Sequence, residues 1–114
     1  MPSLVGQPLS ALDTPQALID LDVVDANLAR MFEAGRQRGV RVRTHFKSLK
    51  CAGLAKNIHA AGGDGFLCAK LSEAEVLADA GLTDILIANQ VVGAIKMRRL
   101  AALANCRRRE NCAV

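Results

Sequence analysis

Tryptophan and tyrosine are absent from this chain of 114 residues, and aromatic residues make up only 3% of it. Proteins that bind single-stranded nucleic acid usually stack the bases on aromatic side chains, and the basic stretches 36–43 and 98–109 contain none. We interpret both stretches as helix ends and solvated helix faces. The uncharged run 85–95 is well below the roughly 18 residues that a membrane helix needs. The sequence therefore favours neither nucleic acid nor a membrane as a partner.

Signals for export and for metal binding are also missing. The N-terminus carries no basic segment ahead of an apolar run, so we expect a cytoplasmic protein. The four cysteines, at positions 51, 68, 106 and 112, form no C-x-x-C pair. We expect reduced thiols, with Cys68 and Cys112 acting as small buried hydrophobic residues. Because His and Cys pairs at the spacing of a zinc site do not occur, we assign no metal ligand in this chain.

Hydrophobic residues make up 51% of the chain and charged residues 23%, which is typical of a globular protein. Their spacing changes repeatedly between the period of a strand and that of a helix. The pattern predicts strands at 17–22, 40–47, 65–70, 84–89 and 111–114, and helices at 22–39, 50–61, 72–81 and 94–108. From residue 40 onward, the spacing leaves room for a helix between successive strands. This excludes hairpins and predicts parallel βα units.

Two helix starts can be read from the sequence. Asp22 is the predicted N-cap of the first helix. Ser72 and Glu75 match a capping box, in which a hydroxyl and a carboxylate three residues apart bind the free backbone N–H groups of a helix start. The apolar stripe expected on the first helix comprises Val24, Leu28, Met31 and Phe32.

Parallel βα units build either an open doubly wound sheet or a (β/α)8 barrel of the TIM type. A complete barrel takes about 250 residues, whereas this sequence stops in a strand at 111–114. The predicted fold class is α/β: a partial (β/α)8 TIM-type barrel, truncated after about three and a half βα units. A parallel sheet seldom leaves an edge uncovered. We therefore expect the chain to be the front part of something longer or to pair with another chain.

The predicted strand 40–47 has one basic face. Its residues alternate strictly, so the apolar ones face one way and the basic ones face the other. Strands of a parallel sheet are usually covered on both sides, and a buried cation needs a partner or a use. Either this strand lies at an edge with its basic face in water, or the basic face points into a barrel. The basic residues are Arg41, Arg43, His45 and Lys47.

Lys47 stands at the carboxyl end of this strand, where βα folds place their sites. Burial and the positive charge of Arg43 and His45 would both disfavour the ammonium form of Lys47. The result would be a nucleophilic amine. Such an amine forms Schiff bases with a carbonyl substrate or with the aldehyde of pyridoxal phosphate.

The run 43–51 (RTHFKSLKC) resembles the lysine segment of D-threonine aldolases and eukaryotic-type D-serine dehydratases, which reads roughly R-P-H-x-K-T-H-K. These fold-type III enzymes share the alanine racemase N-terminal barrel. The resemblance extends over residues 13–104 and includes the segments 17–22, 65–75 and 84–93. Two positions depart from the pattern, since Thr44 replaces the common Pro and Leu49 replaces the second His.

The resemblance implies that residues 1–114 are the N-terminal part of a barrel that binds pyridoxal 5'-phosphate. Lys47 would hold the cofactor covalently and handle the substrate α-proton, with His45 and Arg43 as cofactor-binding neighbours below it. The implied reaction is that of a lyase on D-β-hydroxy amino acids, cleaving Cα–Cβ to give glycine and an aldehyde. The alternatives are a D-serine dehydratase-like enzyme that eliminates water, or a non-catalytic truncated fragment that folds only by association.

Other parts of such an enzyme would lie beyond residue 114. These parts are the phosphate-binding loops, the groups that contact the pyridine ring, the ligands of a divalent metal and a β-rich second domain. Phosphate capture depends on backbone N–H groups near the last strands of a barrel, so we expect the 114-residue chain to be inactive alone. The expected partners are a small D-amino acid and either a second copy in a homodimer or a missing C-terminal domain.

Overall fold

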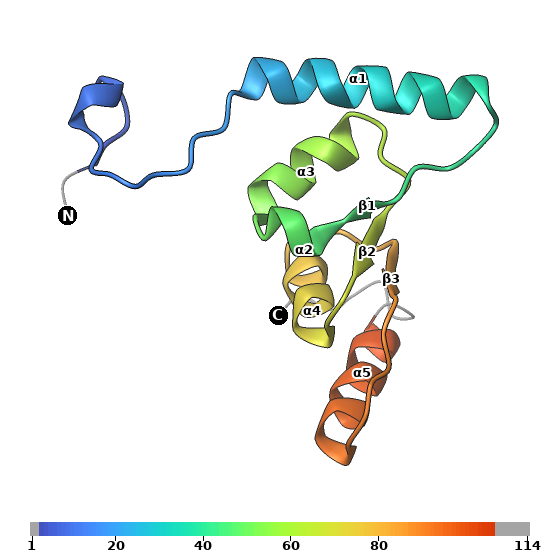
Figure 1. Cartoon of the computed structure of the whole chain (residues 1–114). Coiled ribbons are helices and arrows are strands. Elements are labelled where there is room, and N and C mark those ends of the chain that lie inside the picture. Colours follow the sequence, from blue (N-terminus) through green and yellow to red (C-terminus); the bar gives the residue numbers. More distant parts are fainter. Residues whose placement is uncertain (1–2, 107–114) are drawn as a thin grey trace.

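The structure is a computed structural model and describes residues 3–106. Helices and strands alternate along most of the chain (Figure 1). None of the helices in the described residues is both long and apolar enough to cross a membrane. The elements are η1 (Leu9–Ala11), α1 (Leu21–Gln37), β1 (Thr44–His45), α2 (Phe46–Leu49), α3 (Ala52–Ala60), β2 (Phe66–Cys68), α4 (Leu71–Asp79), β3 (Ile85–Ile87) and α5 (Ala94–Cys106).

The three strands form one parallel sheet in the order β1-β2-β3. Thr44 lies opposite Phe66, which in turn lies opposite Ile85. Helices connect the strands, as parallel pairing requires. The predictions of an α/β fold and of parallel strands near 65–70 and 84–89 are therefore confirmed, although each strand is shorter than its apolar run. The predicted strand 111–114 lies outside the described residues.

The predicted strand 17–22 was wrong. This segment pairs with no described strand, and Figure 1 shows it as an extended connection leading into α1. The side chains of Leu18 and Ile19 are 61% and 59% exposed. Asp20, and not Asp22, is the N-cap of α1, because its Oδ1 accepts the backbone N–H groups of Asp22 at 3.0 Å and Val23 at 3.2 Å. A short apolar alternation does not form a strand without a hydrogen-bonded neighbour.

The predicted strand 40–47 was wrong at both ends, since only Thr44 and His45 pair with β2. After His45 the chain turns into α2, a single helical turn. The side chain of His45 caps this turn, because its Nδ1 accepts the backbone N–H of Lys47 at 3.3 Å. Lys50 then ends the turn in the left-handed conformation, with φ of 47°. Local capping thus ends the alternation two residues before the predicted end of the strand.

The predicted capping box of the next helix was also wrong. Helix α4 begins at Leu71, and Ser72 makes no cap. The carboxylate of Glu73 instead accepts the backbone N–H of Ala69 at 2.8 Å. Glu75 is bound by the guanidinium of Arg99 on α5, so this carboxylate joins two helices and does not close the start of one.

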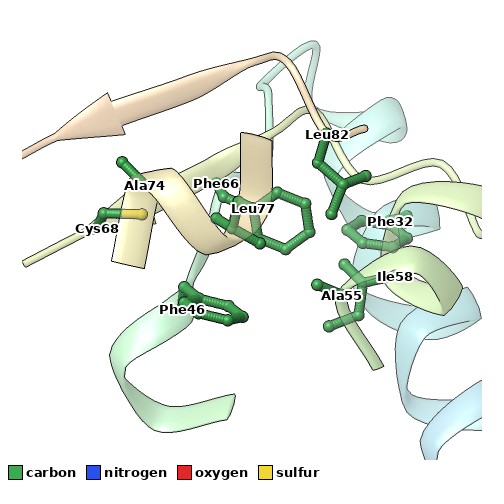
Figure 2. Packing of buried hydrophobic residues seen from close by; sticks show 9 residues of the cluster. All are labelled: Phe32, Phe46, Ala55, Ile58, Phe66, Cys68, Ala74, Leu77 and Leu82. Atoms are coloured by element: carbon green, nitrogen blue, oxygen red, sulfur yellow. The ribbon is translucent and has the colours of Figure 1, made fainter. Parts of the chain in front are cut away.

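The hydrophobic core lies between the sheet and the helices on one side of it. Helices α2 and α4 contact β2, α4 contacts β3, and α3 packs against both helices. Figure 2 shows the core side chains from these elements meeting, with Phe32 of α1 facing Ala55 and Ile58 of α3. On α1, Phe32 is buried and Leu28 packs on the core as predicted, whereas Met31 is 57% exposed. The buried cluster comprises Phe32, Phe46, Ala55, Ile58, Phe66, Cys68, Ala74, Leu77 and Leu82.

The described cysteines differ in burial. Cys68 is fully buried in the core, as predicted for a small hydrophobic residue. Cys51, immediately before α3, is exposed. Cys112 lies outside the described residues, so its predicted burial stays a prediction.

The opposite face of the sheet is open. His45, Leu67 and Leu86 are aligned across the three strands in register, and alternation turns them away from the core residues Phe66 and Cys68. Leu86 is 52% exposed on this face. The Cα radius of gyration, 17.0 Å, exceeds the value of about 13 Å expected for a compact domain of this size. The N-terminal segment, which extends away from the sheet in Figure 1, contributes to this excess.

Candidate functional site

The carboxyl ends of the three parallel strands meet at one edge of the sheet, and Lys47 lies at this edge. It belongs to the first turn of α2, directly after β1, and its side chain is exposed. The strand position predicted for Lys47 was therefore wrong, and its side chain lies in water, as in the alternative of an edge strand with a solvated basic face. Phe46 enters the core at the corresponding point, with an exposed fraction of 3%, and turns the next residue toward the surface. The structure offers a primary amine at an accessible strand end.

His45 precedes this amine by two residues and lies half-buried at the end of β1. Its Nδ1 accepts the N–H of Lys47, so the hydrogen of the neutral ring lies on Nε2. The imidazole is therefore held against the backbone of Lys47 and keeps a donor on its other nitrogen. The sequence placed His45 beside Lys47, and the structure brings the two together through this hydrogen bond.

Arg43 directly precedes β1, at the opposite end from Lys47. Its Nη1 donates to the Oδ1 of Asp84 at 2.8 Å, to the carbonyl oxygen of Asp84 at 3.1 Å and to that of Phe66 at 3.3 Å. Asp84 directly precedes β3, and Phe66 is the first residue of β2. The guanidinium of Arg43 therefore spans the amino-terminal edge of the sheet, and Lys47 lies at the carboxyl edge.

Asp84 is the residue of this region that sequence reasoning missed. Its Oδ2 also accepts from Nη2 of Arg41 at 2.8 Å, so one carboxylate binds both arginines of the basic face. The hydrogen bond from Arg43 holds the pKa of Asp84 below its ordinary value, with Arg41 adding to the effect against an opposing contribution from partial burial. The positive charge of Arg43, which was expected to disfavour the ammonium form of Lys47, is therefore paired with a carboxylate at the opposite edge of the sheet.

A hollow of about 280 Å³ lies at the carboxyl edge, beside the ends of β2 and β3. The amide nitrogen of Asn89 donates to the carbonyl oxygen of Ala69 across it at 3.4 Å. Lys70, for which the sequence suggested no role, lines this hollow. The full lining comprises Ala69, Lys70, Leu71, Ser72, Ile87, Asn89, Gln90, Val91, Lys96 and Arg99. Within residues 3–106, no group of three or more His, Cys, Asp or Glu side chains could hold a metal ion.

Comparison with known proteins identifies relatives of this chain. No protein-family model matches it. A D-threonine aldolase of Arthrobacter sp. is 40% identical over 103 residues, which are 90% of this chain and 27% of the relative. A D-threo-3-hydroxyaspartate dehydratase of Delftia sp. (strain HT23) is 42% identical over 96 residues, which are 80% of this chain and 25% of the relative.

A solved structure has the same fold. The crystal structure of D-threonine aldolase from Filomicrobium marinum matches 85% of this chain with a TM-score of 0.81 and 45% identity, and the match covers 26% of that protein. The chain thus spans about a quarter of the length of the proteins it matches. The resemblance to D-threonine aldolases, read from the lysine segment, is confirmed over most of this chain, and it extends to a hydroxyaspartate dehydratase.

Proposed function

We propose that this chain is part of a pyridoxal-phosphate-dependent lyase that acts on D-configured β-hydroxy amino acids, with Lys47 as the residue that holds the cofactor. One observation carries the proposal. Lys47, the second residue after β1, presents an accessible amine at the carboxyl edge of a parallel sheet, where βα folds place their chemistry. The similarity to D-threonine aldolases supplies the reaction class.

The larger fold in this proposal is a (β/α)8 barrel of which residues 1–114 are the N-terminal part. Three features support it: the strands are parallel, they follow chain order, and the helices cover only one face. In a barrel the other face lines the interior in layers. The side chains of His45, Leu67 and Leu86, which are in register, would face this interior. Either further chain or a second copy in a homodimer would cover the exposed Leu86.

The described residues fit an aldehyde cofactor that carries a phosphate. Among the described residues, neither Lys47 nor His45 forms an ion pair with a carboxylate, and an anionic cofactor is favoured near an unpaired cation such as Lys47. Pyridoxal phosphate, when bound, withdraws electrons from the substrate α-carbon and so weakens its bonds. Lys47 would bind the cofactor through its amine and carry a proton to or from the α-carbon. His45 would donate a hydrogen bond from Nε2 while its Nδ1 stays on the backbone of Lys47.

In this proposal Arg43 does not contact the cofactor directly. Its guanidinium is bound at the amino-terminal edge of the sheet, so Arg43 would hold β1 in place and, through β1, the residues His45 and Lys47. A divalent metal, if the complete enzyme uses one, would take its ligands from residues outside this chain. A cytoplasmic location stays a prediction from the sequence.

A dehydratase is the second candidate, because the Delftia relative is 42% identical and is named as a D-threo-3-hydroxyaspartate dehydratase. Both reactions need the same lysine. They differ in the bond that breaks, which is Cα–Cβ in an aldolase and Cβ–O in a dehydratase.

The experiment is to incubate the chain with pyridoxal phosphate, reduce the product with borohydride and locate the modified lysine by peptide mass spectrometry. We expect imine absorbance and preferential modification at Lys47, with both lost in Lys47→Ala. Lys50→Ala is the matched control, since Lys50 is an exposed lysine three residues away, and it should retain both signals. Equal modification of Lys47, Lys56 and Lys96 would contradict the proposal and favour a non-catalytic fragment.

A further inference from the structure

We infer that Asp84 is a positioning residue for the Lys47–His45 segment, acting through Arg43 and β1. This inference rests on the proposed function of Lys47. It assigns a role to a residue that neither the lysine segment nor its neighbours contain, since Asp84 lies on the connection into β3, two strands away.

The bridge from Asp84 ties the three strands together at their amino-terminal edge. Arg43, next to β1, binds the carboxylate and the carbonyl of Asp84, and it also binds the carbonyl of Phe66 on β2. The Asp84 carbonyl additionally accepts the N–H of Phe66 at 2.8 Å, so the anchor itself is fixed in the sheet. The Arg43 side chain is only 25% exposed, which makes its ion pair less screened by water than a surface pair.

Gly65 makes the bridge sterically feasible. It is buried on β2's amino-terminal side, between Arg43 and Asp84. A Cβ at this position would lie 2.7 Å from Nη1 of Arg43, 2.7 Å from Cγ of Asp84 and 2.5 Å from the carbonyl oxygen of Asp84. The guanidinium therefore crosses the middle strand through space that any side chain would fill.

Strand β1 needs this anchor because it is short. It has only two residues, Thr44 and His45, which pair with β2. The backbone N–H of Thr44 donates to the carbonyl oxygen of Gly65 at 3.1 Å. Lys47 follows two residues after β1, held by Phe46 in the core and by the hydrogen bond of its N–H to His45. Loss of the Asp84 carboxylate would leave the contact of Phe46 and the two backbone-carbonyl contacts of Arg43 in place, but it would remove the ion pair and so weaken the tie of β1, and with it His45, to β3.

The test compares Asp84→Asn with wild type and with Asp25→Asn. Asp25 is an exposed carboxylate on α1 that forms no ion pair with any described residue. The first readout is the ratio of pyridoxal-phosphate modification at Lys47 to that at Lys56 in the same molecule after borohydride reduction. We expect this ratio to fall several-fold in Asp84→Asn and to stay at the wild-type value in Asp25→Asn.

The second readout does not depend on the cofactor. Backbone amide hydrogen exchange at Thr44 and His45 should become several-fold faster in Asp84→Asn, while exchange in α4 stays unchanged. Arg43→Lys keeps a positive charge but loses the multiple hydrogen bonds, so it should give the same changes and serves if Asp84→Asn does not fold.

The outcomes separate the two claims. If wild type is selective for Lys47 and Asp84→Asn has the same selectivity, the positioning role is refuted and the proposed function stands. If wild type lacks selectivity for Lys47, the proposed function fails. In that case unchanged exchange at Thr44 and His45 in the variants would also overturn the bridge, whereas faster exchange would support it.

Discussion

Gly65→Ala adds one methyl group at a position that has no room for it. Gly65 has φ of +113°, a backbone conformation that residues with a Cβ rarely adopt. The added Cβ would also lie 2.5 Å from the Asp84 carbonyl oxygen. This oxygen is backbone and is held by the N–H of Phe66, so it cannot move without disturbing the pairing of β2 with β3.

The magnitude follows from these two costs. A strained φ costs on the order of 1–3 kcal/mol, and overpacking against a fixed neighbour costs about 1–3 kcal/mol more. Gly81→Ala is the matched control, because Gly81 has φ of +83° but nothing within 4 Å of an added Cβ. We therefore expect Gly65→Ala to lower the free energy of unfolding by about 2–6 kcal/mol, and Gly81→Ala by the first cost alone.

The assay is equilibrium unfolding in urea, followed by far-ultraviolet circular dichroism for wild type and both variants. The difference between the two variants isolates the close approach at Gly65 from the cost of a positive φ, which both glycines have. Equal losses of stability in the two variants would refute the argument that the Arg43–Asp84 bridge crosses β2 through the space that Gly65 leaves.

Two further predictions concern the core and the bridge. Leu77→Ala, at a side chain with no exposed surface, should lower the free energy of unfolding by about 2–5 kcal/mol. Val76→Ala, at a side chain that is 48% exposed, should lower it by about 1 kcal/mol or less. Similar urea midpoints for the two variants would contradict the assignment of Leu77 to the core. The pKa of Asp84 is lowered by Arg43, so its contribution to stability should be complete above its ordinary pKa and be lost as pH falls through the lowered value. Unfolding midpoints measured from neutral to acid pH should therefore fall less steeply in Asp84→Asn than in wild type, and parallel curves would contradict this.

The sequence predicted the strands that lie in continuous apolar runs. The runs around Phe66 and Ile85 are apolar, are preceded by turn residues and do form parallel strands. The segment around Leu18 has a similar apolar content but forms no strand, because pairing depends on a neighbour that local pattern does not reveal. Apolar spacing therefore indicated where strands could form, and hydrogen-bonded partners decided which of them do.

The candidate site was predictable in its residues but not in its geometry. The lysine segment identified Lys47, His45 and Arg43, yet strict alternation placed all three on one strand. His45 caps a helical turn through one side-chain hydrogen bond, and the spacing of apolar residues does not predict such a bond. Asp84 could not be predicted from the sequence, because its bond to Arg43 joins residues 41 positions apart. The bond also passes over Gly65, next to the middle strand β2.

The position of the Lys47 amine depends on both faces of the sheet. On the helical face, Phe46 is packed into a core that α2, α3 and α4 build together, and it fixes the residue next to Lys47. On the open face, the bridge from Asp84 fixes β1 and therefore His45. A core substitution would displace the amine only by weakening the whole fold, whereas loss of the bridge would displace it with the core intact. Loss of the bridge should therefore lower the reactivity of Lys47 by more than the accompanying loss of stability explains, whereas core substitutions should lower both together.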